Sequence, residues 1–278
     1  MAMLKDIMAH LDGSANDAVR LAHATKIASL HGARLIGLYT NPLPEYAYVL
    51  AVQSGLAPME PVIEGEERMR KNGDRVVADI EQKLAKLPVP SAIRRLDVGA
   101  SQIIAQCVAE AQWADLFVAV APYRHEYALY WDDLVEAVMF ESGHGIYLIP
   151  DTGHPAPDFE NVLIAWQPTR EAARAIHEAL PFLKTSKTVR LAIANPDWTF
   201  QAPVIVDYFH RHGVSVEIAI LESKEKSVPD ILLDEAHGMK AGLIVLGAYG
   251  HSRFREWVLG GTTREMIERS DIPLLMAH

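Results

Sequence analysis

Short apolar segments recur along this chain and alternate with segments of helical periodicity. The runs at 116–121 and 243–248 are alike and lie 127 residues apart, and those at 7–14 and 162–169 are alike at an offset of 155. Apolar strands that alternate with amphipathic helices require crossover connections, which give a parallel sheet covered on both faces. The repetition therefore predicts an α/β protein built from two consecutive units of one kind.

Each unit is expected to contain five strands and four helices. In the first unit the strands are expected near 4–11, 34–39, 93–98, 116–120 and 145–149, and the helices at 16–30, 64–86, 101–112 and 132–141. In the second unit the strands are expected near 161–166, 188–194, 214–220, 243–247 and 273–276, and the helices at 169–183, 199–212, 228–240 and 261–269. Five strands per unit are typical of a doubly wound sheet.

The boundary between the units is expected at 151–158, a segment rich in turn-forming residues. It divides the chain into a first domain at 1–150 and a second at 159–278, joined by this linker. A second irregular segment, 41–61, carries four prolines and no clear period, and it is expected to form a long loop over one face.

The composition argues against several classes of protein. A formal charge of −10 disfavours a nucleic-acid partner, because binding to a phosphate backbone needs clustered lysine and arginine. The single cysteine, Cys107, excludes a disulfide within the chain. The N-terminus does not resemble a signal peptide, and no apolar run has the length of a membrane span. We therefore expect a cytoplasmic protein without a membrane segment.

The segment after the fourth strand of the second unit is rich in glycine. Gly247 and Gly250 follow the strand, and Gly260 comes after nine further residues, immediately before the helix expected at 261–269. Ligands bind beyond the carboxyl ends of the strands in an open parallel sheet. Glycines there allow backbone N–H groups to approach phosphate oxygens, and a helix N-terminus favours an anion. This arrangement predicts a phosphate-binding loop.

Side chains near this loop extend the prediction. The hydroxyl groups of Thr262 and Thr263 are candidates for a hydrogen bond to phosphate or for coordination of Mg²⁺. Arg253 lies inside the loop and is a candidate for pairing with phosphate, although a solvated loop charge is an equally good interpretation. No histidine spacing matches a zinc signature, so no metal site of the protein's own is expected.

The loop resembles the Gly-x2-Gly-x9-Gly-(Ser/Thr) signature of the ATP-binding members of the universal stress protein family. Gly247, Gly250 and Gly260 match its glycines, whereas Gly261 stands in the Ser/Thr place and Thr262 follows one step later. The resemblance implies five-stranded parallel sheets with helices on both sides, in the strand order 3-2-1-4-5. It also implies ATP as the ligand, with or without Mg²⁺, and a pair of units packed as an intramolecular pseudo-dimer.

The two units keep different parts of the family pattern. ATP-binding members also use an aspartate at the end of the first strand, which Asp12 matches in the first unit and Gln167 replaces in the second. The first unit has lost the glycine loop, because Val120, Tyr123 and Asp133 stand where the glycines would be. We therefore expect the second unit to bind the nucleotide, and Tyr123 to obstruct the space that Gly250 leaves open.

Three functions remain open on the sequence alone. The first is a nucleotide-binding stress-response or regulatory protein without efficient catalysis, since the loop offers no oriented general base and a Walker motif is absent. The second is a tandem interaction protein that binds no nucleotide. The third is an α/β enzyme of the adenylating type. A homodimer of the whole chain is a further possibility.

Overall fold

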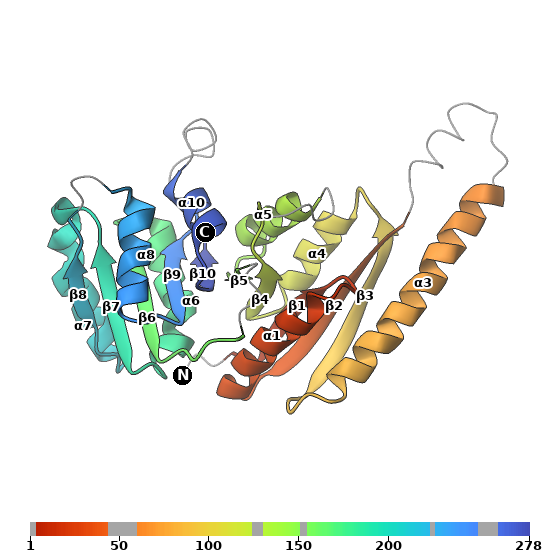
Figure 1. Ribbon diagram of the computed structural model, residues 1–278, viewed down its shortest axis with the longest axis horizontal. Helices are drawn as coiled ribbons and strands as arrows, with labels where there is room; N and C mark the ends of the chain where they lie inside the picture. Colours follow the sequence, from red (N-terminus) through yellow and green to blue (C-terminus); the bar gives the residue numbers. More distant parts are fainter. Residues whose placement is uncertain (1–3, 44–59, 124–129, 151–154, 223–225, 250–260) are drawn as a thin grey trace.

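The computed structural model describes residues 4–43, 60–123, 130–150, 155–222, 226–249 and 261–278. Their ten strands form one sheet in the order β3-β2-β1-β4-β5-β10-β9-β6-β7-β8, with helices on both faces (Figure 1). In the described part of the chain, no helix combines the length and the apolar character needed to span a membrane.

The N-terminal half supplies five neighbouring strands of this sheet. Its elements are β1 (Asp6–Leu11), α1 (Asp17–His31), β2 (Arg34–Leu43), α3 (Glu60–Leu84), β3 (Ser91–Gly99), α4 (Ile103–Ala111), β4 (Leu116–Val120), α5 (Trp131–Glu141) and β5 (Gly145–Ile149). Within the half the strands are parallel and follow the order β3-β2-β1-β4-β5. This is the expected order 3-2-1-4-5.

The C-terminal half repeats the arrangement. Its elements are β6 (Asn161–Trp166), α6 (Arg170–Leu183), β7 (Thr188–Ile193), the 3₁₀ helix η1 (Pro196–Gln201), α7 (Ala202–Arg211), β8 (Glu217–Ile220), α8 (Val228–Gly238), β9 (Leu243–Gly247), α10 (Thr262–Arg269) and β10 (Leu274–Ala277). Its parallel strands run in the order β8-β7-β6-β9-β10, so the same 3-2-1-4-5 order recurs. The predicted α/β fold class is confirmed.

The halves do not form two separate sheets, and this detail of the prediction is wrong. The last strand of each half pairs with the other, antiparallel, so that Leu148 lies opposite Leu274 and Ile146 opposite Met276. Both strands are buried along their whole length. The pairing satisfies backbone N–H and C=O groups that two separate sheets would leave unpaired at these edges.

The core consists of one apolar layer on each side of the sheet. Helices α1, α3, α6 and α7 contribute to one layer, and α4, α5, α8 and α10 to the other. Because each layer contains residues of both halves, the sheet is covered without interruption at the junction of β5 and β10. This is the burial on both faces that the apolar strand runs predict.

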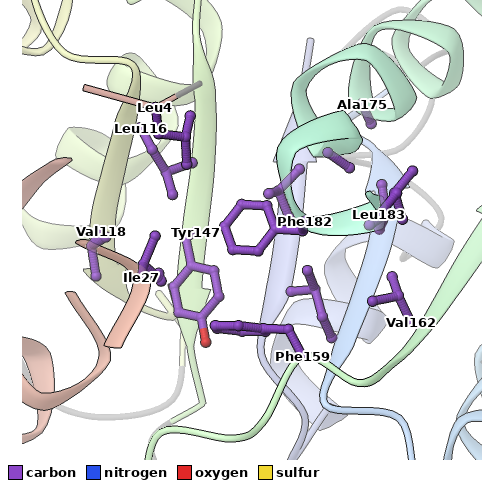
Figure 2. Packing of buried hydrophobic residues seen from close by; sticks show 14 of the residues in the cluster. Leu4, Ile27, Leu116, Val118, Tyr147, Phe159, Val162, Ala175, Phe182 and Leu183 are labelled. Carbon is purple, nitrogen blue, oxygen red and sulfur yellow. The ribbon is translucent and has the colours of Figure 1, made fainter. Parts of the chain in front are cut away.

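An aromatic cluster packs the two halves together (Figure 2). Phe182 of α6 has its ring centroid 5.1 Å from that of Phe159 and 5.2 Å from the ring of His31 in α1. Tyr147 of β5 contacts Phe159 edge to face, and its hydroxyl lies 3.0 Å from Nδ1 of His23 in α1. The side chains of Phe182 and Tyr147 are fully buried. The halves are therefore joined by a continuous core as well as by the sheet.

Candidate functional site

A cavity of about 270 Å³ opens at the carboxyl ends of β6, β7 and β9 in the C-terminal half. Four residues singled out from the sequence line it, namely Gln167, Gly247, Thr262 and Thr263. They come from three separate segments of the chain and meet because the carboxyl ends of parallel strands share one edge of the sheet. The volume lies just below the usual range for small-molecule sites, about 300–1,000 Å³.

Gln167 and Gly247 lie at the carboxyl ends of two neighbouring strands. Gln167 follows β6 directly, and two residues later Thr169 caps α6 by accepting a hydrogen bond from the N–H of Ala172 at 3.2 Å. Gly247 is the last residue of β9, and its neighbour Ala248 is bonded through its N–H to the carbonyl of Ala277. These contacts therefore hold Gln167 and Gly247 in place at the carboxyl ends of β6 and β9.

The N-terminus of α10 borders the cavity on the other side. Its N-cap residue is Gly261, which has an extended conformation and provides no side-chain cap. Thr262 is exposed and Thr263 is buried, and Oγ1 of Thr263 accepts a hydrogen bond of 3.4 Å from the N–H of Tyr249. A helix N-terminus without a capping side chain offers free N–H groups and a partial positive charge to an anion.

Three further residues of the predicted site, Gly250, Arg253 and Gly260, lie outside the described residues. Their part in a phosphate-binding loop stays a prediction. The same holds for the expectation that Tyr123 obstructs the space left open by Gly250. Among the residues that the structure does describe, no three His, Cys, Asp or Glu side chains gather in a way that would hold a metal ion.

Gly247 has a packing role that the sequence analysis missed. A Cβ atom at this position would lie 2.5 Å from the backbone nitrogen of Ala172 and 2.7 Å from the carbonyl carbon of Glu171, both in α6. Backbone atoms cannot move aside as a flexible side chain can, so the close approach of α6 to β9 requires glycine. A substitution at Gly247 would therefore disturb the packing of α6 against β9, so it cannot serve as a clean test of ligand binding.

Two tryptophans of the cavity were also missed. Trp166 is the last residue of β6, and Trp198 lies in η1. Of the described residues that line the cavity, none carries a charge, and half are aliphatic. The signal available in the sequence was the position of Trp166, which ends the first strand of the unit immediately before Gln167.

The corresponding position in the N-terminal half is occupied by an internal ion cluster. Nη2 of Arg20 lies 2.9 Å from Oδ2 of Asp12, and its Nη1 lies 2.8 Å from Oδ1 of Asp17. The side chains of Arg20 and Asp17 are fully buried, whereas Asp12 is partly exposed. Asp17 also accepts hydrogen bonds from the N–H groups of Gly13, at 2.8 Å, and Asp12, at 3.2 Å. The carboxylate of Asp12 is thus bound by the protein's own guanidinium.

This cluster shifts the pKa of its members in opposite directions. Burial opposes ionisation of Asp12, but the hydrogen bond and charge of Arg20 outweigh it and hold the pKa of Asp12 well below its usual value. Burial, together with the negative charge of Asp12, raises the pKa of Asp17. The pKa of the buried His10 is lowered to about 3 by burial and by the charge of Arg20. His10 is therefore neutral near pH 7, and its Nε2 lies 2.9 Å from Oγ1 of Thr40.

Tyr123 connects the two halves at this edge of the sheet. It has a φ of 70°, and its N–H donates to Oδ1 of Asp132 at 3.0 Å. Its hydroxyl donates to Glu136 and lies 3.1 Å from the hydroxyl of Tyr249, which belongs to the loop after β9. The guanidinium of Arg264, in α10, lies 4.5 Å from the centre of the Tyr123 ring. Tyr123 thus contacts the elements that carry the cavity of the other half.

Comparison with known proteins supports this description of the fold. The model of the universal stress protein family matches residues 158–278. A universal stress protein from Archaeoglobus fulgidus DSM 4304 superposes with a TM-score of 0.76 at 16% identity, over 99% of this chain and 96% of that one. The functionally unknown protein PA1789 from Pseudomonas aeruginosa PAO1 superposes with a TM-score of 0.60 at 14% identity, over 98% of this chain and 92% of that one. At the level of sequence, no curated protein matches the chain.

At these identities the two solved structures show a shared fold, and the family assignment comes from the matched sequence model. The matched residues contain β6 to β10 and all of the described residues that line the cavity. The N-terminal half repeats their strand order. Residues 158–278 therefore match the universal stress protein family, and a second unit with the same strand order precedes them.

Proposed function

We propose that this chain is a nucleotide-binding stress-response or regulatory protein and that ATP binds in the cavity of the C-terminal half. The observation that carries the proposal is the convergence of Gln167, Gly247, Thr262 and Thr263 on one cavity beside the uncapped N-terminus of α10. These residues supply an amide, a strand end without a side chain and two hydroxyl groups. Together they match what a nucleotide with a phosphate tail requires.

In this proposal the phosphates lie at the N-terminus of α10. The free N–H groups of its first turn and the Thr262 hydroxyl donate to phosphate oxygens, and Gln167 binds the ribose or base end. Mg²⁺ would arrive with the nucleotide and take its ligands from phosphate oxygens and a threonine hydroxyl. Gly250, Arg253, Gly260 and Gly261 complete the loop on the resemblance to the family signature.

Efficient hydrolysis is not part of the proposal. The cavity lining in the described part of the chain supplies hydroxyl groups, an amide and indole rings, none of which accepts a proton from water near pH 7. A protein that binds ATP and turns it over slowly, if at all, suits a regulatory role. We further propose that the domains at 1–150 and 159–278 form an intramolecular pseudo-dimer through β5 and β10. We also propose that the protein acts in the cytoplasm.

A tandem interaction protein is the second candidate. The observation that favours it is the exposure of four apolar side chains in η1, α7 and the edge strand β8, namely Phe200, Val204, Ile218 and Ile220. Exposed apolar patches often mark protein contacts. This function does not require the cavity to bind a nucleotide, so it predicts a folded protein that does not bind ATP.

Replacing Thr262 by valine tests the site with little change of shape. The hydroxyl is lost while the volume of the side chain is kept, and a hydrogen bond to a charged phosphate contributes about 1.5–3 kcal/mol. Calorimetric titration should therefore find ATP bound about ten- to a hundred-fold more weakly than by the wild type.

The matched control is Thr188→Val. Thr188 is the first residue of β7 and therefore lies at the end of the strands opposite to the cavity. It should bind ATP as the wild type does. The proposal fails if the wild type does not bind ATP. Equal affinity of Thr262→Val and Thr188→Val would exclude the Thr262 hydroxyl from the contacts to phosphate.

A further inference from the structure

The segment that follows β9 is held by the N-terminal half. Tyr249 is the second residue after this strand, and its φ of 50° lies in the left-handed region. A residue with a side chain keeps that conformation only where its surroundings hold it. The hydroxyl of Tyr249 lies 3.1 Å from the hydroxyl of Tyr123, and its ring centroid lies 5.4 Å from that of Phe140 in α5. Both contacts come from the other half of the chain.

Tyr249 is also connected to the cavity. Its N–H donates to Oγ1 of Thr263, a buried residue in the first turn of α10 that lines the cavity. Gly247, two residues before Tyr249, lines the cavity as well. Tyr249 therefore lies between a lining glycine and the helix whose N-terminus we assign to the phosphates. A displacement of its backbone would break the contact that holds the Thr263 hydroxyl.

Tyr123 is anchored on the N-terminal half and contacts α10 directly. Its N–H donates to Oδ1 of Asp132 at 3.0 Å, and its hydroxyl donates to Glu136, both in α5. Because a hydroxyl has one proton to donate, the hydroxyl of Tyr249 is the donor in the contact between the two tyrosines. The guanidinium of Arg264, in the first turn of α10, lies 4.5 Å from the centre of the Tyr123 ring, which is the distance of a cation–π contact.

We infer that Tyr123 is a positioning residue for the nucleotide site of the C-terminal half and that it acts through Tyr249 and α10. The inference rests on the proposed function. It gives the N-terminal half, which lacks the glycine loop, a part in the ligand affinity of the half that has it. A purely structural role of Tyr123 leads to a different result, because loss of its hydroxyl would then lower stability and leave ATP affinity unchanged.

The test compares ATP binding by calorimetry in the wild type, Tyr123→Phe and Tyr147→Phe. Tyr123→Phe keeps the ring beside Arg264 but removes the hydroxyl that Tyr249 contacts. We expect it to bind ATP about two- to ten-fold more weakly, as the loss of one hydrogen bond implies. Thermal midpoints show whether each variant is folded.

Tyr147→Phe is the matched control. It also removes a buried hydroxyl at the junction of the halves, one that lies 3.0 Å from Nδ1 of His23. Tyr147 belongs to the apolar layer on the other side of the sheet from Tyr123 and Tyr249, so this variant should keep the ATP affinity of the wild type. Equal weakening by Tyr123→Phe and Tyr147→Phe would contradict the inference, because the effect would then belong to the junction as a whole.

A double-variant cycle identifies the contact through which Tyr123 acts. Tyr249→Phe should weaken ATP binding by a factor similar to that of Tyr123→Phe. The two changes combined should weaken it little further, because each removes the same hydrogen bond. If the two factors multiply, Tyr123 does not act through Tyr249.

A further measurement uses the wild type and decides the question even if Tyr123→Phe does not fold. Coupling between two parts of a protein is reciprocal, so ATP should slow amide hydrogen exchange in α5. If the wild type binds ATP but exchange in α5 does not change, or if Tyr123→Phe binds ATP as tightly as the wild type, the inference is wrong and the proposed function stands. If the wild type binds no ATP, the proposed function fails, and the inference fails with it.

Discussion

Replacing Arg20 by methionine is expected to lower the free energy of unfolding by about 3–5 kcal/mol. The guanidinium is fully buried and bonded to both Asp12 and Asp17. Without it, the buried carboxylate of Asp17 keeps only its bonds to backbone N–H groups, next to a second negative charge. An uncompensated buried charge costs far more than the ion pair itself contributes. Chemical denaturation at neutral pH measures the loss.

Arg34→Met is the matched control. Arg34 pairs with Asp6 at 2.8 Å, but both side chains are substantially exposed, so its loss should cost at most about 1 kcal/mol. Asp17→Asn combined with Arg20→Met should recover part of the stability, because the buried negative charge is then absent. A loss for Arg20→Met no larger than that for Arg34→Met would contradict the assignment of a buried ion cluster.

Phe182→Ala is expected to destabilise the protein by about 3–5 kcal/mol and to do so in both halves. The ring is fully buried between His31 of the N-terminal half and Phe159. Its removal leaves a cavity at the junction that Figure 2 shows. Because the core is continuous across this junction, amide hydrogen exchange should accelerate in β1 as well as in β6.

Phe209→Ala separates this effect from simple loss of core volume. Phe209 is also fully buried, in α7, and its ring contacts Tyr208 of the same helix. The Phe209→Ala variant should lower the stability of the C-terminal half by a comparable amount. Amide hydrogen exchange in β1 should accelerate less in this variant than in Phe182→Ala. If Phe182→Ala leaves β1 protected as in the wild type, the two halves unfold independently, contrary to this account.

Much of the fold follows from local pattern. The short apolar runs at 116–120 and 145–149 coincide with β4 and β5, and the expected strand at 243–247 coincides with β9. Such runs are predictable because a strand buried on both faces is apolar throughout. The edge-to-edge pairing of β5 with β10 was not predictable. An apolar run shows that a strand is buried, but it does not show which neighbour covers its edge.

The site was predictable where its chemistry lies in one short segment. Thr262 and Thr263 follow glycines at a helix start, which is a local signal, and they line the cavity. The ion cluster was not predictable, since Arg20 reaches both a partner on its own helix and Asp12 at a strand end, and only the fold brings these together. Trp166 resembles any apolar strand residue until the cavity beside it is known.

The central claim is that one chain carries one nucleotide site, in its C-terminal half. Calorimetric titration of the wild-type protein with ATP tests it most directly, because stoichiometry and affinity come from the same curve. The account predicts one ATP bound per chain, with Asp12 of the N-terminal half already bound to Arg20. Two equivalent sites per chain, or no binding at all, would contradict it.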